Sequence, residues 1–235
     1  MIVYQQFKIK KMKKLSEKKL TNENRSKFTP KQVWKKMVAG NERFRDQGLS
    51  IDRDYSKDIQ KTKNGQSPLA AFVSCIDSRV PVEVIFDLAI GEVFNSRVAG
   101  NFINNDILGG LEFAYGTGIK LIFVLGHTSC GAIDAAIANC GCPSQETKKE
   151  GGGHILPMID NLCNSVCRAD YHADKEVRTR AVIEKNVWVS IENIRLNSEL
   201  LRTAELKGKI QIRGGVYEVK QGKGEVTFFE YDNPK

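Results

Sequence analysis

The sequence has no long apolar run and few prolines. No apolar stretch approaches the roughly 20 residues that a membrane-spanning helix needs, and the run from Leu121 to Leu125 has the size of a buried strand. Six prolines beside 20 glycines, with 41% hydrophobic residues among 235, argue against a disordered chain. We therefore expect a folded protein with one hydrophobic core and no membrane partner.

Acidic residues are scarce only near the amino end. The whole chain has 36 Lys and Arg against 28 Asp and Glu, a net charge of +8. Residues 1–36 contain 12 of these bases and two of these acids, so the rest has a net charge of −2. We expect 1–28 to be a basic, flexible segment and 29–235 to be one domain. A body without net positive charge does not favour a nucleic acid partner.

The amino-terminal residues also lack the apolar stretch of roughly 7–15 residues found in secretory signals. The Lys-rich segment could bind polyanions weakly or act in targeting, but lysine runs are usually just hydrated. We therefore expect a cytoplasmic protein. In that reducing compartment cysteines serve as metal ligands or thiols more often than as disulfides.

Apolar periodicity predicts an α/β fold: a single domain with a mostly parallel central β-sheet flanked by helices, an N-terminal helical arm and C-terminal closing strands. Thr29 and Pro30 form a helix start, because a hydroxyl cap precedes a proline at the first helical position. The expected strands are 69–75, 92–99, 120–125, 209–217 and 225–231. The expected helices are 30–48, 81–88, 107–115, 130–138 and 173–206, the last with a break inside it.

Two short polar clusters follow predicted strands. Cys75, Asp77 and Arg79 come at the end of the first strand, and in an extended chain alternate residues point the same way. His127 and Cys130 lie where the third strand turns into a helix, and the positive helix N-terminus favours a Cys130 thiolate. Open α/β sheets build their sites at the carboxyl ends of strands, so we expect the two clusters to meet.

Two thiolates and an imidazole are a ligand set that suits zinc. A lone buried cysteine is more often a small apolar side chain, but Cys75, His127 and Cys130 occur together at two matching strand ends. Three protein ligands leave the fourth tetrahedral position open, which is typical of catalytic zinc sites. The sequence therefore predicts a catalytic zinc centre.

The pattern Cys-x-Asp-x-Arg followed by His-x-x-Cys-Gly resembles the signature of β-class carbonic anhydrases. The segments 78–81, 97–101 and 111–114 also match that family's pattern, and the resemblance extends over about 30–220. The resemblance implies reversible hydration of carbon dioxide to bicarbonate and a proton by a zinc-bound hydroxide, with one Zn²⁺ per subunit. It also implies a homodimer, or a tetramer of two dimers.

The same resemblance implies a role for each residue of the two clusters. Cys75, His127 and Cys130 bind zinc. Asp77 accepts a hydrogen bond from the hydroxide, and Arg79 keeps Asp77 ionised and oriented through a bidentate contact. In a closed state that some members of the family adopt, Asp77 becomes the fourth zinc ligand instead.

Further residues are implied for the substrate pocket. Gln66 corresponds to a glutamine that hydrogen-bonds a substrate oxygen, with an ordinary loop residue as the alternative. The residues expected to line the pocket are Phe94, Ala99, Phe113 and Gly131. For Phe94 the alternative is an ordinary core residue. Phe113 stands where the family often has tyrosine, so we expect a pocket without that hydroxyl.

The other cysteines and histidines are open to more than one interpretation. Cys140, Cys142, Cys163 and Cys167 are expected to be reduced thiols rather than a second zinc site, because their spacing matches no strong template. His154 and His172 are candidate proton shuttles, with ordinary surface histidines as the alternative.

Two other functions fit the same residues. One is hydrolysis of carbon disulfide or carbonyl sulfide on the same metal, and the other is a non-catalytic zinc-binding protein. A structural zinc site needs neither an open coordination position nor the Asp77–Arg79 pair, which favours an enzyme. Because two thiolates neutralise the ion more than histidines would, we expect activity to rise above neutral pH.

Overall fold

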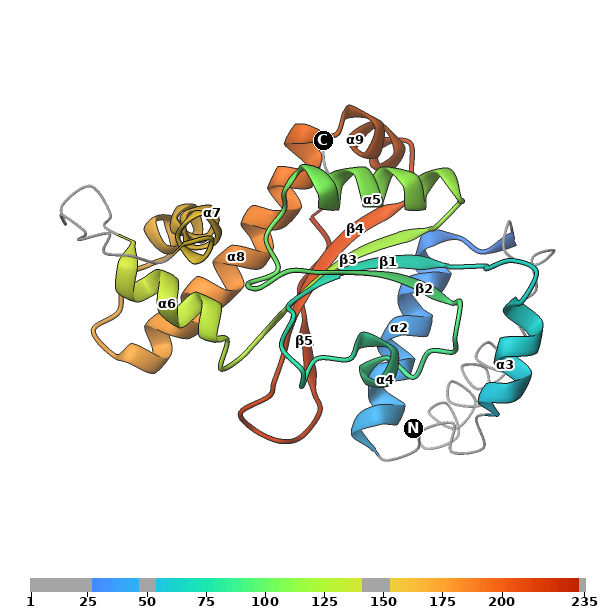
Figure 1. Cartoon of the computed structure of the whole chain (residues 1–235), viewed down its shortest axis with the longest axis horizontal. Coiled ribbons are helices and arrows are strands. Elements are labelled where there is room, and N and C mark those ends of the chain that lie inside the picture. Colours follow the sequence, from blue (N-terminus) through green and yellow to red (C-terminus); the bar gives the residue numbers. More distant parts are fainter. Residues whose placement is uncertain (1–26, 47–53, 141–152, 233–235) are drawn as a thin grey trace, which may run out of the picture.

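The computed structural model describes residues 27–46, 54–140 and 153–232. Its centre is a five-stranded sheet in the order β2-β1-β3-β4-β5 (Figure 1). The first four strands are parallel and β5 is antiparallel to β4. The strands are β1 (Ala70–Ser74), β2 (Val93–Arg97), β3 (Leu121–His127), β4 (Gln211–Tyr217) and β5 (Val226–Phe228). The predicted fold class is confirmed.

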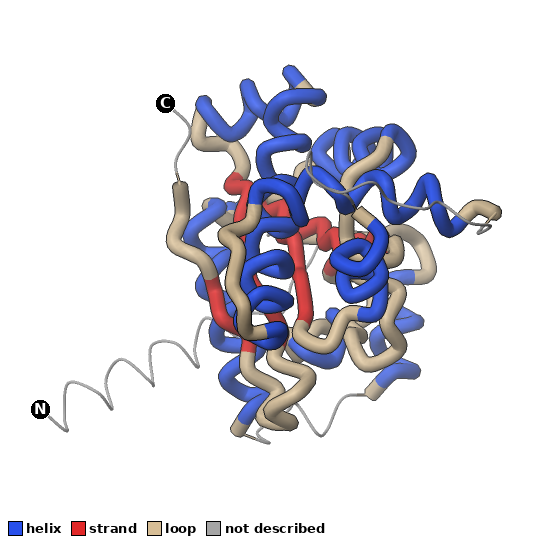
Figure 2. Tube along the Cα trace, turned by 90° about the vertical axis from the view of Figure 1, so that its left-hand side faces the viewer, coloured by secondary structure: helices blue, strands red, loops and turns tan. Residues whose placement is uncertain are grey.

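Helices cover both faces of the sheet (Figures 1 and 2). The helices are α2 (Pro30–Arg45), α3 (Tyr55–Thr62), α4 (Val82–Ile85), α5 (Asn105–Gly116), α6 (Gly131–Asn139), α7 (Ile155–Arg168), α8 (Lys175–Asn197) and α9 (Glu199–Leu206). Residues of α2 and α4 share one core cluster, and residues of α5 to α9 share the other. The sheet therefore lies between two apolar layers.

Every residue of β1 and β3 is buried, and alternate side chains enter the two layers. In β1, Phe72 faces the layer of α2, whereas Val73 faces the layer of α8. Strands buried on both faces are continuous apolar runs instead of alternating patterns. This is why the runs at 69–75 and 120–125 could be recognised in the sequence.

The start of α2 confirms the predicted cap. Thr29 accepts a hydrogen bond from the backbone of Gln32, whose side chain accepts one from the Thr29 backbone. This reciprocal pair satisfies amide groups that a helix start would otherwise leave without partners. The helix ends at Arg45 with Asp46 as its C-cap, earlier than expected, and residues 47–48 lie outside the described residues.

Two helices were not predicted. The polar helix α3 has no buried residue, so it shows no apolar stripe. Helix α7 does have one, with Ile159, Leu162 and Val166 buried against α6 and α8, but it follows a Gly-rich segment and has a proline in its first turn. The expected helix 173–206 is α8 followed by α9, with the break at Ser198, whose side chain caps α9.

None of the helices in the described ranges combines the length and the apolar character needed to cross a bilayer.

Candidate metal centre

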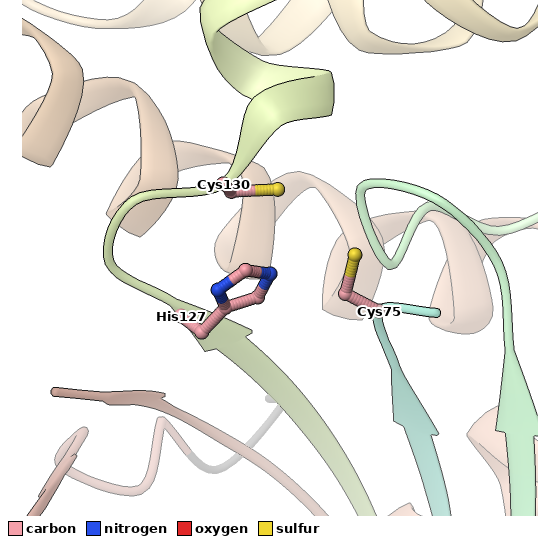
Figure 3. A group of neighbouring side chains, drawn as sticks. All are labelled: Cys75, His127 and Cys130. Carbon is pink, nitrogen blue, oxygen red and sulfur yellow. The ribbon is translucent and has the colours of Figure 1, made fainter. Parts of the chain in front are cut away.

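Cys75, His127 and Cys130 converge at the carboxyl end of the sheet. Cys75 directly follows β1, His127 ends β3 and Cys130 caps α6, and β1 and β3 are neighbours in the sheet. Their ligand atoms all lie within 4.8 Å of one another (Figure 3). All three residues are buried, so the predicted convergence of the two clusters is confirmed.

The imidazole of His127 has one nitrogen satisfied and one free. Nδ1 donates to the backbone oxygen of Thr128 at 3.0 Å, which places the proton on Nδ1. Nε2 is buried without a hydrogen-bond partner, although buried polar atoms almost always have one. A lone pair directed at two cysteine sulfurs is what a metal ion requires, so the residues fit a zinc ion.

The two cysteines differ in acidity in the metal-free chain. A hydrogen bond from the Cys130 thiol and, more weakly, one from the Gly100 backbone amide lower the pKa of the Cys75 thiol. The nearby Cys75 sulfur and burial raise the pKa of Cys130. The expected helix effect on Cys130 is present through the Ala132 and Ile133 amides, but it is the weaker influence. The metal-free pair therefore shares one proton, which a metal ion would displace.

Asp77 and Arg79 form the predicted pair. Arg79 Nε and Nη2 donate to the two oxygens of Asp77 at 2.9 and 2.7 Å, and this contact holds the pKa of Asp77 well below its ordinary value. Asp77 Oδ2 lies 4.0 Å from His127 Nε2. The carboxylate is thus ionised, oriented and next to the ligand cluster.

The backbone route to this pair differs from the extended chain that we expected. The chain turns after Asp77, where the Val80 backbone amide donates a hydrogen bond to the backbone oxygen of Asp77. Asp77 Oδ1 also accepts from the Arg79 backbone amide at 2.9 Å, as aspartate often does in turns. The expected alternation was wrong, because this turn, not strand geometry, brings Arg79 back to Asp77.

The sequence reasoning did not assign a role to Arg97, which supports the centre from the end of β2. Its Nε donates to the backbone oxygen of Cys75 at 2.9 Å, and its Nη2 donates to that of Asp77 at 2.5 Å. The signal available in the sequence was an arginine at the end of a strand in a segment already noted as similar to the family. The register pairs Arg97 with Ser74, directly before Cys75.

The residues expected in the substrate pocket come from several elements of the fold. Phe94 on β2 and Phe113 on α5 meet edge to face, with ring centroids 6.1 Å apart. Phe113 is 65% exposed, and Ala99 is half-buried. Gly131 begins α6 beside open space. The two aromatic rings thus contact each other, and the role of these four residues in a substrate pocket stays a prediction.

Gln66 is not brought to the centre of its own chain. It precedes β1 and lies near Gly91, whereas Cys75 follows the same strand. Five strand residues alone extend about 16 Å. Gln66 and Cys75 are therefore at opposite ends of β1, and Gln66 could contribute only to the site of another subunit.

The expectation of reduced thiols outside the centre was wrong for three cysteines. Cys140 at the end of α6 is bonded to Cys163 in α7, with Cα atoms 5.3 Å apart. Cys167 is also disulfide-bonded. The packing of α6 on α7 brings the two sulfurs together. The spacing of the cysteines in the sequence does not reveal this contact. Cys142 lies outside the described residues.

The two other histidines are not part of the metal cluster. His154 is exposed directly before α7, and His172 is half-buried between α7 and α8. Their role as proton shuttles stays a prediction.

Comparison with known proteins identifies the family. The carbonic anhydrase family model matches residues 70–224. The chain is 39% identical over 202 residues to a carbonic anhydrase of Mycolicibacterium smegmatis, covering 84% of this chain and 93% of that protein. The chain belongs to the β class of carbonic anhydrases. Membership of this family implies a lyase, and the family is zinc-dependent.

Solved structures of β-carbonic anhydrases share the fold. The Coccomyxa enzyme in complex with acetazolamide gives a TM-score of 0.65 at 24% identity, covering 83% of this chain and 86% of that one. A chain from the crystal structures of two tetrameric β-carbonic anhydrases of the filamentous ascomycete Sordaria macrospora gives a TM-score of 0.59 at 22% identity. The match covers 82% of this chain and 91% of that one.

Proposed function

We propose that this protein catalyses the reversible hydration of carbon dioxide to bicarbonate and a proton with one Zn²⁺ bound by Cys75, His127 and Cys130. The observation that carries the proposal is the buried Nε2 of His127, which has no partner among protein atoms and faces two cysteine sulfurs. When bound there, zinc would supply an activated water as a nucleophile near neutral pH.

Asp77 would orient that nucleophile. The carboxylate is ionised because Arg79 donates two hydrogen bonds to it, so it can only accept a hydrogen bond from the attacking oxygen. Accepting that hydrogen bond fixes the direction of the oxygen lone pair toward the substrate carbon. Arg79 also donates to the backbone oxygen of Ser129 at 3.1 Å, which ties the pair to the loop bearing Cys130.

The bidentate contact with Arg79 supports an arrangement in which Asp77 stays off the metal. A carboxylate that became the fourth ligand would have to give up at least part of this contact. We therefore propose that the fourth position is available to water in the resting protein.

We also propose that the active protein is a homodimer, which could pair further into a tetramer. Several large apolar side chains are exposed, among them Ile76, Val84, Ile90 and Phe113, and exposed apolar side chains of this size favour a protein interface. A second copy would also explain how Gln66 could reach a metal centre, since it lies at the far end of β1 from its own.

A complementation experiment tests the contribution of Gln66. Neither Gln66→Ala nor Cys75→Ser subunits should be fully active alone. In a mixed dimer, the Cys75→Ser chain supplies Gln66 to the intact metal centre of its partner, so activity should rise above that of either variant alone. Mixtures that show only the average of the two variants would rule out a role across subunits.

The central test is stopped-flow hydration of carbon dioxide by Asp77→Asn beside the parent protein. Turnover should fall about 100-fold, the scale of one preorganised polar contact to a reacting atom, while zinc content is unchanged. Asp87→Asn is a matched control, because Asp87 is also paired with an arginine, Arg43, but outside the centre. Full activity of Asp77→Asn, or a zinc-loaded parent without activity, would contradict the proposal.

A cytoplasmic location remains a prediction with its own test. The expectation of reduced thiols that followed from it was wrong for Cys140, Cys163 and Cys167, and disulfides are rare in the cytosol. Alkylation of free thiols in intact cells should label both residues if the protein resides there. Protection of both from alkylation would indicate an oxidising compartment.

A further inference from the structure

The turn that follows β2 donates a hydrogen bond to a proposed zinc ligand. The Gly100 amide donates to Cys75 Sγ at 3.4 Å in a buried position. Donors to a ligating sulfur withdraw charge from it and help to set the properties of the metal. The orientation of the Gly100 peptide therefore bears on the chemistry of the centre.

Glycine is required at this position for two reasons. Gly100 has φ +80, a conformation that side-chain-bearing residues rarely adopt. A Cβ there would also lie 2.8 Å from Leu162 Cδ1 of α7. The Asn101 amide closes the turn on the Val98 oxygen at 3.0 Å, which places Gly100 where type II turns need positive φ.

Asn186 of α8 holds the other side of this turn. Its Nδ2 donates to the Gly100 oxygen at 2.7 Å, and its side chain is buried, with 2% exposed. The peptide between Gly100 and Asn101 is thus fixed at both ends, its amide by Val98 and its oxygen by Asn186. With that peptide fixed, the rotation that would turn the Gly100 amide away from Cys75 is blocked.

The amide of Asn186 has its own orienting partner. Ser165 of α7 donates from Oγ to Asn186 Oδ1 at 3.0 Å, and both groups are buried. Because this oxygen accepts from Ser165, the nitrogen must face Gly100. A chain of hydrogen bonds therefore runs from Ser165 through Asn186 to the Gly100 turn and Cys75.

We propose that Asn186 is a positioning residue for the metal centre, which aligns the Gly100 amide with the Cys75 sulfur and thereby sets the electron donation of this ligand. The inference rests on the proposed zinc function. Asn186 touches neither metal nor substrate in this proposal and acts only through the turn.

Cobalt substitution provides a readout besides activity. Co²⁺ bound to thiolate absorbs in the near ultraviolet by charge transfer from sulfur. Loss of a hydrogen bond raises the energy of the sulfur electrons, so Asn186→Ala should move this band to longer wavelength. Zinc affinity at neutral pH, measured by chelator competition, should fall about tenfold, the lower end for a lost contact to a ligand.

Asn41→Ala is the matched control. Asn41 is equally buried and bonds to the backbone of Ile85, Gly224 and Val226, but it belongs to the layer of α2 and not to the centre. The Asn41→Ala protein should lose stability as the Asn186→Ala protein does. Its cobalt band and its zinc affinity should stay at the values of the parent protein. A folded Asn186→Ala protein with the parent's band and affinity would overturn the proposal.

Ser165→Ala decides the question if Asn186→Ala does not fold. It removes only the hydrogen bond that orients the amide, so the band should shift in the same direction by a smaller amount, and an unshifted band overturns the proposal. A parent protein without any thiolate-to-cobalt band is a different result, because it would overturn the zinc centre itself and the inference with it.

Discussion

Two regions of the molecule use cysteine in opposite ways. At the carboxyl end of β1 and β3, Cys75 and Cys130 are free thiols that share a buried site with His127. Where α6 packs on α7, Cys140 and Cys163 are bonded to each other. Both pairs lie close together in space and far apart in sequence, so proximity alone does not decide which chemistry a pair performs.

The neighbours of each pair account for the difference. The centre offers a free imidazole nitrogen, a carboxylate and backbone amides, which stabilise a metal ion with an open position. The disulfide region offers helix surfaces and apolar side chains such as Ile159, and no described histidine or carboxylate shares a metal-binding group with those sulfurs. A cysteine pair needs further ligands to hold a metal.

The largest expected effect separates the two regions directly. Cys130→Ser should abolish stoichiometric zinc binding and reduce hydration activity by roughly 1,000-fold or more, because water that is not bound to zinc is a far weaker acid and supplies little hydroxide near neutral pH. Cys140→Ser, in the disulfide region, should retain one zinc per chain. Metal analysis and stopped-flow assays check both variants. Two tightly bound zinc ions per parent chain would contradict the distinction between a metal-binding and a disulfide-bonded pair.

The next effect concerns stability. The Cys140–Cys163 bond closes a loop with a sequence separation of 23, and its removal should lower the free energy of unfolding by about 3 kcal/mol through the entropy of the unfolded chain. Urea unfolding of the double variant Cys140→Ser, Cys163→Ser measures this. Zinc content should be unchanged, and loss of metal from this variant would show that the regions are not independent.

A smaller effect is the dependence of activity on pH. Two thiolates leave the bound water less acidic than three histidines would, so turnover should rise about tenfold between pH 7 and 9. The Cys140→Ser variant should give the same profile as the parent protein, because the disulfide region does not contact the ion. A profile that is flat from pH 6 to 9 would contradict the expected thiolate ligation.

The smallest effect tests proton transfer. His154 is exposed before α7, on the disulfide side of the molecule, and an exposed imidazole can pass protons to buffer. His154→Ala should lower turnover a few-fold in dilute buffer and have no effect in concentrated imidazole buffer. His172→Ala is the companion variant. Unchanged buffer dependence in both would remove histidine shuttles from the mechanism.

Much of the fold and the centre could be predicted because the signals are local. The buried runs around Phe72 and Phe123 and the Thr29 cap needed only their immediate sequence. The cluster of Cys75, His127 and Cys130 followed from the rule that parallel strands present their ends at one edge. Helix α7 escaped prediction, because its apolar stripe is short and follows a Gly-rich segment.

The sequence by itself determined the α/β fold, the family and the five residues of the centre, since these depend on strand ends and short spacings. Only the tertiary structure decided which cysteines are oxidised, that His127 has a free nitrogen, and that Gln66 lies far from its own centre. The same holds for Asn186, which reaches the oxygen of Gly100 across 86 positions of sequence. Such contacts depend on how helices pack on the sheet, and no local pattern records that packing.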